Sequence, residues 1–204
     1  MKRAREYRAM ARETLGHDLF GSKWLWALLV LFLESLLLGL VSATIIGAIV
    51  SVILVGPLTF GVIRIFLRIA RKEDDQADIN YLFDGFKEKF SESFITSLLV
   101  GIFTFLWSLL LIVPGIIKSY AYSASMYLVH ERNMEGTQAI TESRKLMYGH
   151  KWQAFCLDLS FIGWYIVGFL CLGVGVLWVD AYHAAAKVHF YEDILAQQEV
   201  IDVE

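Results

Sequence analysis

The stretch that decides the fold is LLIVPGIIKSYAYSASMYLVHER, residues 110–132. It begins as an apolar run, meets Pro114-Gly115, and continues as an aromatic-rich segment that contains Lys118. Such a stretch either ends one membrane span or forms the outer turn between two membrane helices. The choice fixes the number of crossings, because a turn at Pro114-Gly115 makes residues 116–129 a returning helix.

The composition is typical of an integral membrane protein. Of the 204 residues, 57% are hydrophobic and 19% are charged, whereas soluble domains have about 45–50% apolar and about 25% charged residues. The 18 basic residues are spread between the apolar runs, so no basic patch supports nucleic-acid binding. Both cysteines, Cys156 and Cys171, lie in apolar sequence without a metal or CxxC spacing, and we interpret them as packing residues.

Residues 1–23 are interpreted as a retained cytoplasmic segment, because basic and acidic residues alternate there and no short apolar core with a cleavage site follows. At helical spacing one side carries Tyr7, Met10, Ala11 and Leu15, while the arginines take the other side. Two interpretations remain open: an amphipathic helix on the membrane surface, and a helix with a merely solvated charged face.

Hydropathy and charge give different numbers of spans. Apolar runs cover residues 24–69, 94–117 and 154–179, and about 20 residues cross a bilayer, so hydropathy alone predicts four spans. The first run breaks near Ser42, Ala43, Thr44 and Gly47. With four spans the five basic residues of 118–151 would lie outside, against the positive-inside rule. Returning helices over 116–129 and 181–195 bring all 18 basic residues to the cytoplasmic side or toward it.

We therefore predict an all-α polytopic membrane bundle with about six membrane helices in three hairpins; four full spans are the alternative. A repeat supports this, because tripeptides at 21–23, 85–87 and 149–151 recur every 64 residues ahead of apolar helices. The predicted hinges are Pro57, Pro114 and Gly115. The predicted organisation is one membrane domain, residues 1–204, with an N-terminal segment (1–23), hairpins (24–70, 94–130, 153–195) and amphipathic cytoplasmic linkers (78–92, 135–152).

The two linkers show apolar faces at helical spacing. In the first linker the face consists of Ile79, Leu82, Phe83, Phe86 and Phe90, and in the second of Ala139, Ile140, Leu146 and Met147.

Polar side chains inside the predicted membrane segments are the candidate functional residues, because charge at the bilayer centre is unfavourable and has to face the bundle interior, water or headgroups. Glu34 lies near mid-bilayer and has three interpretations: a neutral acid, an ion pair with Arg64 or Lys187, or an acid exposed to a wet path. Asp158 is one to two turns from Trp152, which favours interfacial solvation. The complete set is Glu34, Arg64, Lys118, Asp158, His183 and Lys187.

Catalytic signatures do not occur in the sequence. HExxH, GxSxG and GxxxxGK[ST] are missing, and the five histidines are scattered over different segments. We expect no enzyme activity, no cofactor and no metal. Gly173-Val174-Gly175 is interpreted as a close turn or a close helix contact.

Three blocks in order, FLWSLLLIVPGIIKSYAYSASMYLV, AITESRKLMYGHKWQAFCLDLSFIGW and LWVDAYHAAAKVHFYEDIL, resemble the uncharacterised bacterial membrane family of domain of unknown function 975. In that family the last block usually has proline before tyrosine, whereas this chain has Ala181-Tyr182, which puts a sharp proline turn in doubt. The Pro-Gly turn, the Ser143 region and Gly149 are also weakly similar to the membrane domain of glycerophosphodiester phosphodiesterases. The resemblance implies a multi-pass protein of the bacterial cytoplasmic membrane, and it supplies no activity or active-site residue.

Two functional hypotheses follow. In the first, a non-enzymatic membrane module with a cytoplasmic N-terminus handles, senses or transports a lipid or small amphiphile. Its partners would be the bilayer and anionic headgroups. The polar side chains of the returning helices, among them Arg64, Lys118 and Lys187, would contact these partners. In the second, the chain is a membrane scaffold whose cytoplasmic amphipathic helices dock an unknown protein partner. Glu34→Gln and replacement of the linker phenylalanines distinguish the two.

Overall fold

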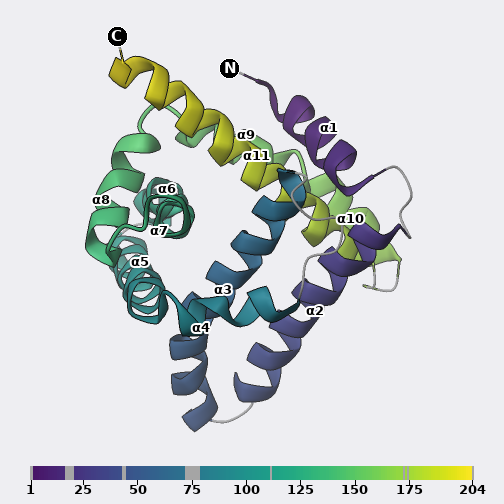
Figure 1. The fold of residues 1–204 in the computed structure, drawn as a ribbon, viewed down its shortest axis with the longest axis horizontal. Coiled ribbons are helices and arrows are strands. Elements are labelled where there is room, and N and C mark those ends of the chain that lie inside the picture. The colour runs from purple at the N-terminus through teal and green to yellow at the C-terminus, as the bar shows by residue number, and fades with distance from the viewer. Residues whose placement is uncertain are drawn as a thin grey trace. The chain divides into compact units, whose positions relative to one another are not determined.

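The chain is helical throughout the part that the structure describes (Figure 1). The computed structural model describes residues 2–16, 21–42, 45–71, 79–110, 112–171, 173 and 175–203. No strand occurs among these residues, which confirms the all-α prediction. The helices are α1 (Ala4–Leu15), α2 (Ser22–Ser42), α3 (Ile45–Ala70), the 3-10 helix η1 (Ile79–Phe83), α4 (Asp84–Lys87), α5 (Phe90–Leu110), α6 (Ile112–Tyr122), α7 (Ser125–Arg132), α8 (Gly136–Leu146), α9 (Lys151–Leu159), α10 (Ile162–Leu170) and α11 (Gly175–Val203).

Four helical segments of the described chain are long and apolar enough to cross a membrane: Ser22–Gly39, Val50–Ala70, Phe90–Leu109 and Lys151–Leu170. Several of their large apolar side chains face outward, and Leu109 is 75% exposed. An apolar surface of this kind is compatible with a lipid environment. The first apolar run breaks near the predicted point, since α2 ends at Ser42 and α3 begins at Ile45; Ala43 and Thr44 lie outside the described residues.

The helices group into two compact units. Unit 1 comprises Met1–Ser35, Ile65–Ile79 and Trp152–Glu204, and unit 2 comprises Leu36–Arg64 and Asn80–Lys151. The prediction of a single membrane domain stays a prediction.

In unit 1, α11 runs back along α10 and α9. Gly168 of α10 lies against Gly175 at the start of α11, and a Cβ added to Gly168 would be only 2.9 Å from the Gly175 carbonyl carbon. Further along the pair, Tyr165 contacts Asp180 and Asp158 contacts His183. At the turn between α10 and α11, the two helices meet through the small residues Gly168 and Gly175. Farther from the turn they meet through polar side chains. The close helix contact predicted for Gly175 is therefore confirmed.

The returning helix α11 starts earlier than predicted, at Gly175 instead of residue 181. Residues 175–179, which hydropathy assigned to the apolar run 154–179, therefore belong to α11. The physical reason is Ala181, which continues a helix where proline would interrupt it. The turn uses Gly173 instead, whose φ of +77° lies in the left-handed region that glycine adopts without strain.

The long apolar helix of unit 1 is interrupted, although its sequence predicts one continuous span. α9 ends at Leu159 and α10 begins at Ile162. The Ser160 hydroxyl donates to the Leu157 carbonyl oxygen at 2.6 Å, and the Ser160 N–H is shared between the carbonyls of Cys156 and Leu157 at 3.0 and 3.1 Å. A serine that bonds locally to the backbone competes with the regular helical pattern.

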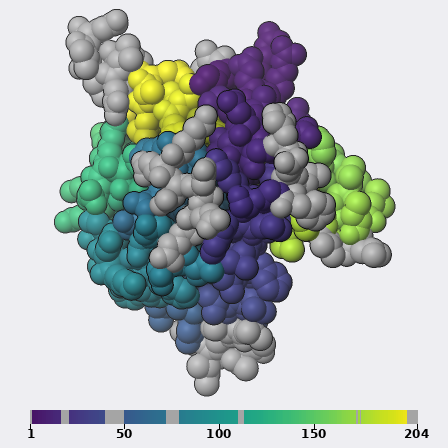
Figure 2. Space-filling view, turned by 45° about the vertical axis from the view of Figure 1, so that its right-hand side comes forward, coloured from purple at the N-terminus to yellow at the C-terminus, as the bar shows by residue number. Residues whose placement is uncertain are grey.

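The N-terminal helix α1 packs against the C-terminal half of α11, and Figure 2 shows the two segments side by side in purple and yellow. Its apolar side, with Tyr7, Ala11 and Leu15, is almost completely buried. The Tyr7 ring meets the edge of Phe190 at a centroid distance of 5.3 Å. Neither of the two sequence interpretations had anticipated this contact, because the covering helix lies nearly two hundred residues away in the chain.

In unit 2, α5 contacts α6, α7 and α8. α6 begins at Ile112, so Pro114 and Gly115 lie in its first turn and do not themselves separate two helices. Proline fits this position because the first turn of a helix does not use its own N–H groups. Gly115 packs on Ser108 of α5, where an added Cβ would lie 2.8 Å from the Ser108 Cα.

The predicted first linker is not one amphipathic helix. Residues 79–90 form η1, α4 and the start of α5, and the predicted apolar face is divided: Leu82 is fully buried, whereas Phe83 and Phe90 are each 41% exposed. The reason is close backbone packing, since Gly85 lies against Pro57 and Gly61 against Leu82. The pattern of phenylalanines instead forms a row of neighbouring rings, Phe83, Phe86, Phe90 and Phe94.

The second predicted linker contains α8, and its apolar residues Ala139, Ile140 and Leu146 are buried. α8 lies alongside α5, since Gly136 packs on Ile95 and Thr96 while Arg144 shares a cavity with Phe103 and Trp107. The Ser143 hydroxyl donates to the Ala121 carbonyl oxygen of α6 at 2.9 Å. The apolar face of α8 is thus covered by its own unit.

Candidate functional site

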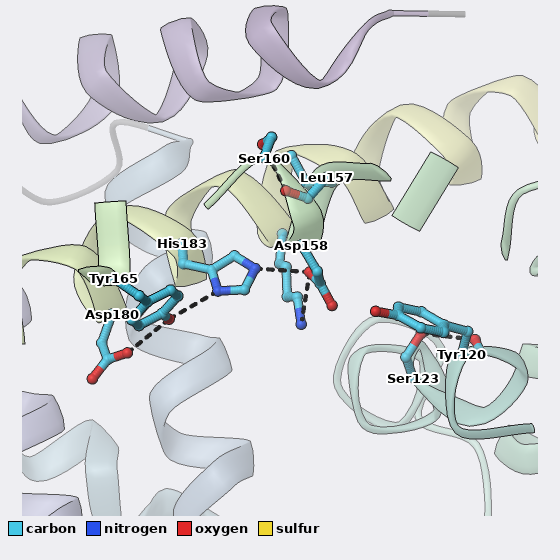
Figure 3. A network of polar contacts seen from close by, with 9 residues as sticks. Tyr120, Ser123, Leu157, Asp158, Ser160, Tyr165, Asp180 and His183 are labelled. Atoms are coloured by element: carbon cyan, nitrogen blue, oxygen red, sulfur yellow. Dashed lines mark hydrogen bonds and ion pairs between the residues drawn. The ribbon is translucent and has the colours of Figure 1, made fainter. Parts of the chain in front are cut away.

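A chain of five polar side chains connects α9 and α10 with α11 in unit 1 (Figure 3). The Tyr165 hydroxyl donates to Asp180 Oδ1 at 2.8 Å and lies 3.0 Å from His183 Nδ1. His183 Nε2 is 2.8 Å from Asp158 Oδ1, and Lys187 Nζ is 3.3 Å from the same oxygen. We call these residues, Asp158, Tyr165, Asp180, His183 and Lys187, the Asp158 chain.

Each group of the Asp158 chain has a partner within the chain. Tyr165 has a single hydroxyl hydrogen and donates it to Asp180. His183 contacts Tyr165 with Nδ1 and Asp158 with Nε2, and which nitrogen donates depends on the tautomer. Lys187 forms an ion pair with Asp158.

The sequence identified three members of this chain, Asp158, His183 and Lys187, as separate candidates. The structure brings them together, since Asp158 contacts both His183 and Lys187. The Asp158 side chain is still 25% exposed, so its solvation at an interface stays a prediction. Tyr165 and Asp180 were missed as site residues. The position of the acid Asp180 beside the predicted outer turn could have identified Asp180 from the sequence. The Phe161 ring stacks on His183 at a centroid distance of 4.5 Å, and no sequence pattern indicated this contact.

Arg8 binds the interruption between α9 and α10. Its Nη1 donates to the Ser160 carbonyl oxygen at 3.1 Å, which belongs to the residue where the regular helix pattern stops. A second polar contact joins α1 to α11, since the Tyr7 hydroxyl donates to Asp193 Oδ2 at 2.7 Å. Burial and then this bond to Asp193 raise the pKa of Tyr7, so the hydroxyl remains a donor. α1 is therefore held by polar as well as apolar contacts.

A cavity of about 360 Å³ opens beside the Asp158 chain, between α1, α2, α10 and α11 of unit 1. Four aromatic rings line it, from Trp24, Trp164, Trp178 and Tyr182, and Arg12 is the one charged residue among its described lining. Gly168, Gly175 and Cys171 complete the far end. We call this space the aromatic cavity. Sequence patterns did not indicate this cavity, because its walls come from four separate helices.

The remaining predicted residues lie elsewhere. Arg64 contacts Asp84 at 3.1 Å and Glu88 at 2.6 Å, and thereby joins α3 to α4 inside unit 2. Lys187 is bonded to Asp158. Both cations proposed as partners of Glu34 are thus engaged with other acids, and Glu34 has no hydrogen bond or ion pair with any residue that the structure describes. An ion pair was one of the three interpretations of Glu34, and the functional role of Glu34 stays a prediction.

Lys118 lies in unit 2, with its Nζ 4.5 Å from the centroid of the Trp107 ring. It lines a cavity of about 450 Å³ together with Arg144, Tyr122 and Thr137. We call this space the basic cavity. Of the predicted hinges, Pro57 lies inside α3 against Gly85, and Pro114 and Gly115 lie in the first turn of α6.

The described residues contain no group of three or more histidine, cysteine, aspartate or glutamate side chains that could hold a metal ion. The cysteines Cys156 and Cys171 are free, and Cys171 is exposed at the end of α10.

The sequence matches the model of the family described as "Protein of unknown function (DUF975)" over residues 1–119 and 109–198. The chain belongs to the DUF975 family. Searches of curated proteins and of solved structures gave no match. The weaker likeness to the membrane domain of glycerophosphodiester phosphodiesterases therefore stays a prediction. Membership in DUF975 confirms the resemblance found in the sequence.

Proposed function

We propose that this DUF975 protein is a multi-pass membrane protein that binds an anionic amphiphile in the aromatic cavity, without catalysing a reaction. The observation that carries the proposal is the combination of aromatic walls with a single cation, Arg12. Ligand cavities of about 300–1,000 Å³ are generally apolar with a few polar groups that fix orientation. The volume and lining of the aromatic cavity fit this description.

The lining of the aromatic cavity offers surfaces for both parts of an amphiphile. Trp164, Val167 and Val179 offer apolar surface for a hydrocarbon chain. Arg12 is exposed on α1 and has no acidic partner among the described residues, so it is available to a carboxylate or phosphate group. Trp24 is fixed by a hydrogen bond from its Nε1 to the Gly16 carbonyl oxygen at 3.0 Å. A rigid ring beside an available guanidinium suits an amphipathic ligand at the membrane interface.

The proposal includes a topology of six membrane helices in three hairpins, in the bacterial cytoplasmic membrane with the N-terminus inside. Its support is the antiparallel course of α11 along α9 and α10, and of α6 along α5. If one helix of such a pair crosses the bilayer, its partner lies at the same depth. Labelling of single cysteines tests this in intact cells: residue 116 and the native Cys171 should react from outside, and residue 135 should not.

The ligand proposal is tested with a brominated fatty acid, which quenches tryptophan fluorescence on contact. Purified protein in neutral detergent should show saturable quenching that unlabelled fatty acid reverses. Arg12→Gln should weaken binding by about tenfold, because one charge-assisted bond is lost. Arg5→Gln is the matched control, since Arg5 is an exposed arginine on the same helix that does not line the cavity.

Two results would overturn the ligand proposal. One is equal binding by the wild type and Arg12→Gln; the other is an equal loss in Arg5→Gln, which would indicate general charge attraction. Trp152→Phe serves to identify the quenched rings, because Trp152 is 71% exposed on α9 and lies outside the cavity. The quenching should persist in that variant.

The scaffold hypothesis rests on a smaller surface than the sequence suggested. α1 and α8 bury their apolar sides within their own units. In the row of Phe83, Phe86 and Phe90, Phe83 and Phe90 are each 41% exposed, and these rings are the exposed part of the predicted docking surface. Replacement of these three residues by serine should release any bound partner, and co-purification of every partner with that variant would count against a scaffold.

A further inference from the structure

The basic cavity of unit 2 contains positive charge without a matching acid. Lys118 of α6 and Arg144 of α8 both line it, and no acidic residue does so among its described lining. Neither cation has a hydrogen bond or ion pair to an acid within the described part of the chain. Glu142, the acid closest to Arg144 in sequence, is bonded to Lys145 at 2.6 Å.

Packing holds the two cations near each other despite their repulsion. Arg144 and Lys151 both act on Lys118 as like charges. α8 is fixed on α5 and α6 by buried Ile140 and by the bond from Ser143 to Ala121, so Arg144 is carried to the cavity by its helix. Two like charges that a fold holds together without a counter-charge mark a place where an anion lowers the free energy.

The other walls of the cavity define what the anion is attached to. Phe103 and Trp107 of α5, Tyr122 of α6 and Leu99 provide aromatic and aliphatic surface. The Phe103 and Tyr122 rings contact at 6.1 Å, and the Trp107 ring lies under the Lys118 ammonium. On the polar side, Thr137 and Thr141 add hydroxyl groups from α8. The Thr141 hydroxyl already donates to the Thr137 carbonyl at 3.1 Å, which leaves the Thr137 hydroxyl as the additional donor.

We propose that the basic cavity binds a phosphate monoester attached to an apolar group, as in the headgroup of phosphatidic acid. A phosphate monoester carries nearly two negative charges and three acceptor oxygens at neutral pH. Lys118 and Arg144 match the charge, Thr137 supplies a hydroxyl donor, and Phe103 and Trp107 contact the apolar part. The aromatic cavity differs, because it presents one cation and suits a singly charged ligand.

The position of α8 strengthens this assignment. The sequence analysis assigned Lys118 to a returning helix and Arg144 to the second linker. In the structure both residues line one cavity with Phe103 and Trp107, which belong to the second half of α5. If α5 crosses a bilayer, charges at this depth are stable only beside water or an anion. A bound phosphate satisfies that requirement.

The test uses the full chain in nanodiscs of phosphatidylcholine with a small fraction of phosphatidic acid, and lipid retention is measured by mass spectrometry. Phosphatidic acid should be enriched over phosphatidylcholine. The double variant K118Q/R144Q should lose this enrichment by about tenfold or more, because two charge-assisted contacts are removed. Lys145→Gln is the control, since Lys145 is the next residue on α8, carries the same charge and is paired with Glu142.

A second measurement identifies the source of the phosphate. Inorganic phosphate is titrated against protein in neutral detergent, and thermal stabilisation that depends on Lys118 and Arg144 supports the anion site with free phosphate as its ligand. Arg144→Lys should retain binding in part, which separates charge from a loss of folding. Equal enrichment of phosphatidic acid in the wild type and the double variant would overturn the proposal, as would an equal loss in Lys145→Gln. Arg12→Gln should leave the enrichment unchanged, so the two proposed sites can fail independently.

Discussion

In the Asp158 chain of unit 1 the charged side chains are paired with one another, whereas in the basic cavity of unit 2 they are not. In the Asp158 chain, two acids alternate with His183 and Lys187, and each group contacts a partner at 3.3 Å or less. In the basic cavity, Lys118 and Arg144 face the same space without an acid among the described lining. Both lie among aromatic side chains, so the surroundings do not explain the difference.

This difference in pairing suggests that the Asp158 chain has a structural role and that the basic cavity is a binding site. A chain whose members are one another's partners orders the helices that carry it, whereas unmatched charge needs a counter-charge from outside. When one group of a paired network is removed, its partner stays desolvated without a hydrogen bond or counter-charge, which lowers the stability of the fold. Removal of one of two repelling cations has no such consequence. The Asp158 chain should therefore govern stability, and the basic cavity should govern binding.

The largest effect is expected for Asp158→Leu, because Asp158 is the common partner of His183 and Lys187. Removing it leaves two donors without an acceptor between α9 and α11. The free energy of unfolding should fall by about 2–3 kcal/mol, which is below the value for fully buried pairs since these side chains are partly exposed. The measurement is unfolding of the purified protein by SDS, followed by circular dichroism.

The control for this prediction is Glu142→Leu in unit 2. Glu142 is also the partner of a lysine, at 2.6 Å, but the Lys145 side chain is 64% exposed. Loss of an exposed pair should change stability by about 0–1 kcal/mol. If Asp158→Leu and Glu142→Leu have the same small effect, the Asp158 chain is not a structural element and the comparison fails.

Much of unit 1 could be predicted from the sequence, whereas its site could not. The three polar residues Asp158, His183 and Lys187 were recognisable, because charge in an apolar helix requires an explanation. Their mutual contacts depend on the register between α9 and α11. That register is set by the tip, where Gly168 meets Gly175 and where Ala181 allows α11 to begin early. Periodicity within one helix does not contain information on register between two helices.

Unit 2 shows the same limit for amphipathic patterns. The apolar side of α8 was correctly identified, but a pattern says only that a face is covered and not what covers it. The amphipathic pattern of Ala139 and Ile140 is satisfied equally well by the membrane surface and by the side of α5. Close backbone approach at Gly136, where an added Cβ would lie 2.9 Å from the Thr96 nitrogen, decides between them. The meeting of Lys118 with Arg144 follows from that choice.

The next largest effect is expected where two antiparallel helices meet at their turn, at Gly168 in unit 1 and at Gly115 in unit 2. Both contacts are uncharged, so the two units can be compared by packing alone. Gly168→Ala should destabilise the protein by about 1–2 kcal/mol, because the new Cβ would overlap the backbone of Gly175 and force the helices apart. Gly115→Ala should act similarly through Ser108 in unit 2. The readout is again unfolding by SDS.

Two helical glycines serve as controls for the tips, Gly163 in α10 and Gly101 in α5. An added Cβ at either position meets no atom within 4 Å. Alanine at these positions should be neutral or stabilise the helix by about 0.5–1 kcal/mol, because alanine has the higher helix propensity. An equal loss of stability at Gly168 and Gly163 would show that the contact with Gly175 does not hold the pair together.

The smallest effect is expected for Lys118→Met, and it tests the other side of the comparison. This variant loses a cation–π contact with Trp107, which is about 0.5–1 kcal/mol at exposed sites, and it also removes repulsion from Arg144 and Lys151. Because the two contributions oppose each other, the free energy of unfolding should change by less than about 0.5 kcal/mol. Methionine retains the length and apolar stem of lysine, so packing against Trp107 is kept. A loss as large as that of Asp158→Leu would mean that Lys118 has a structural acidic partner, and the basic cavity would then be a second complete network instead of a binding site.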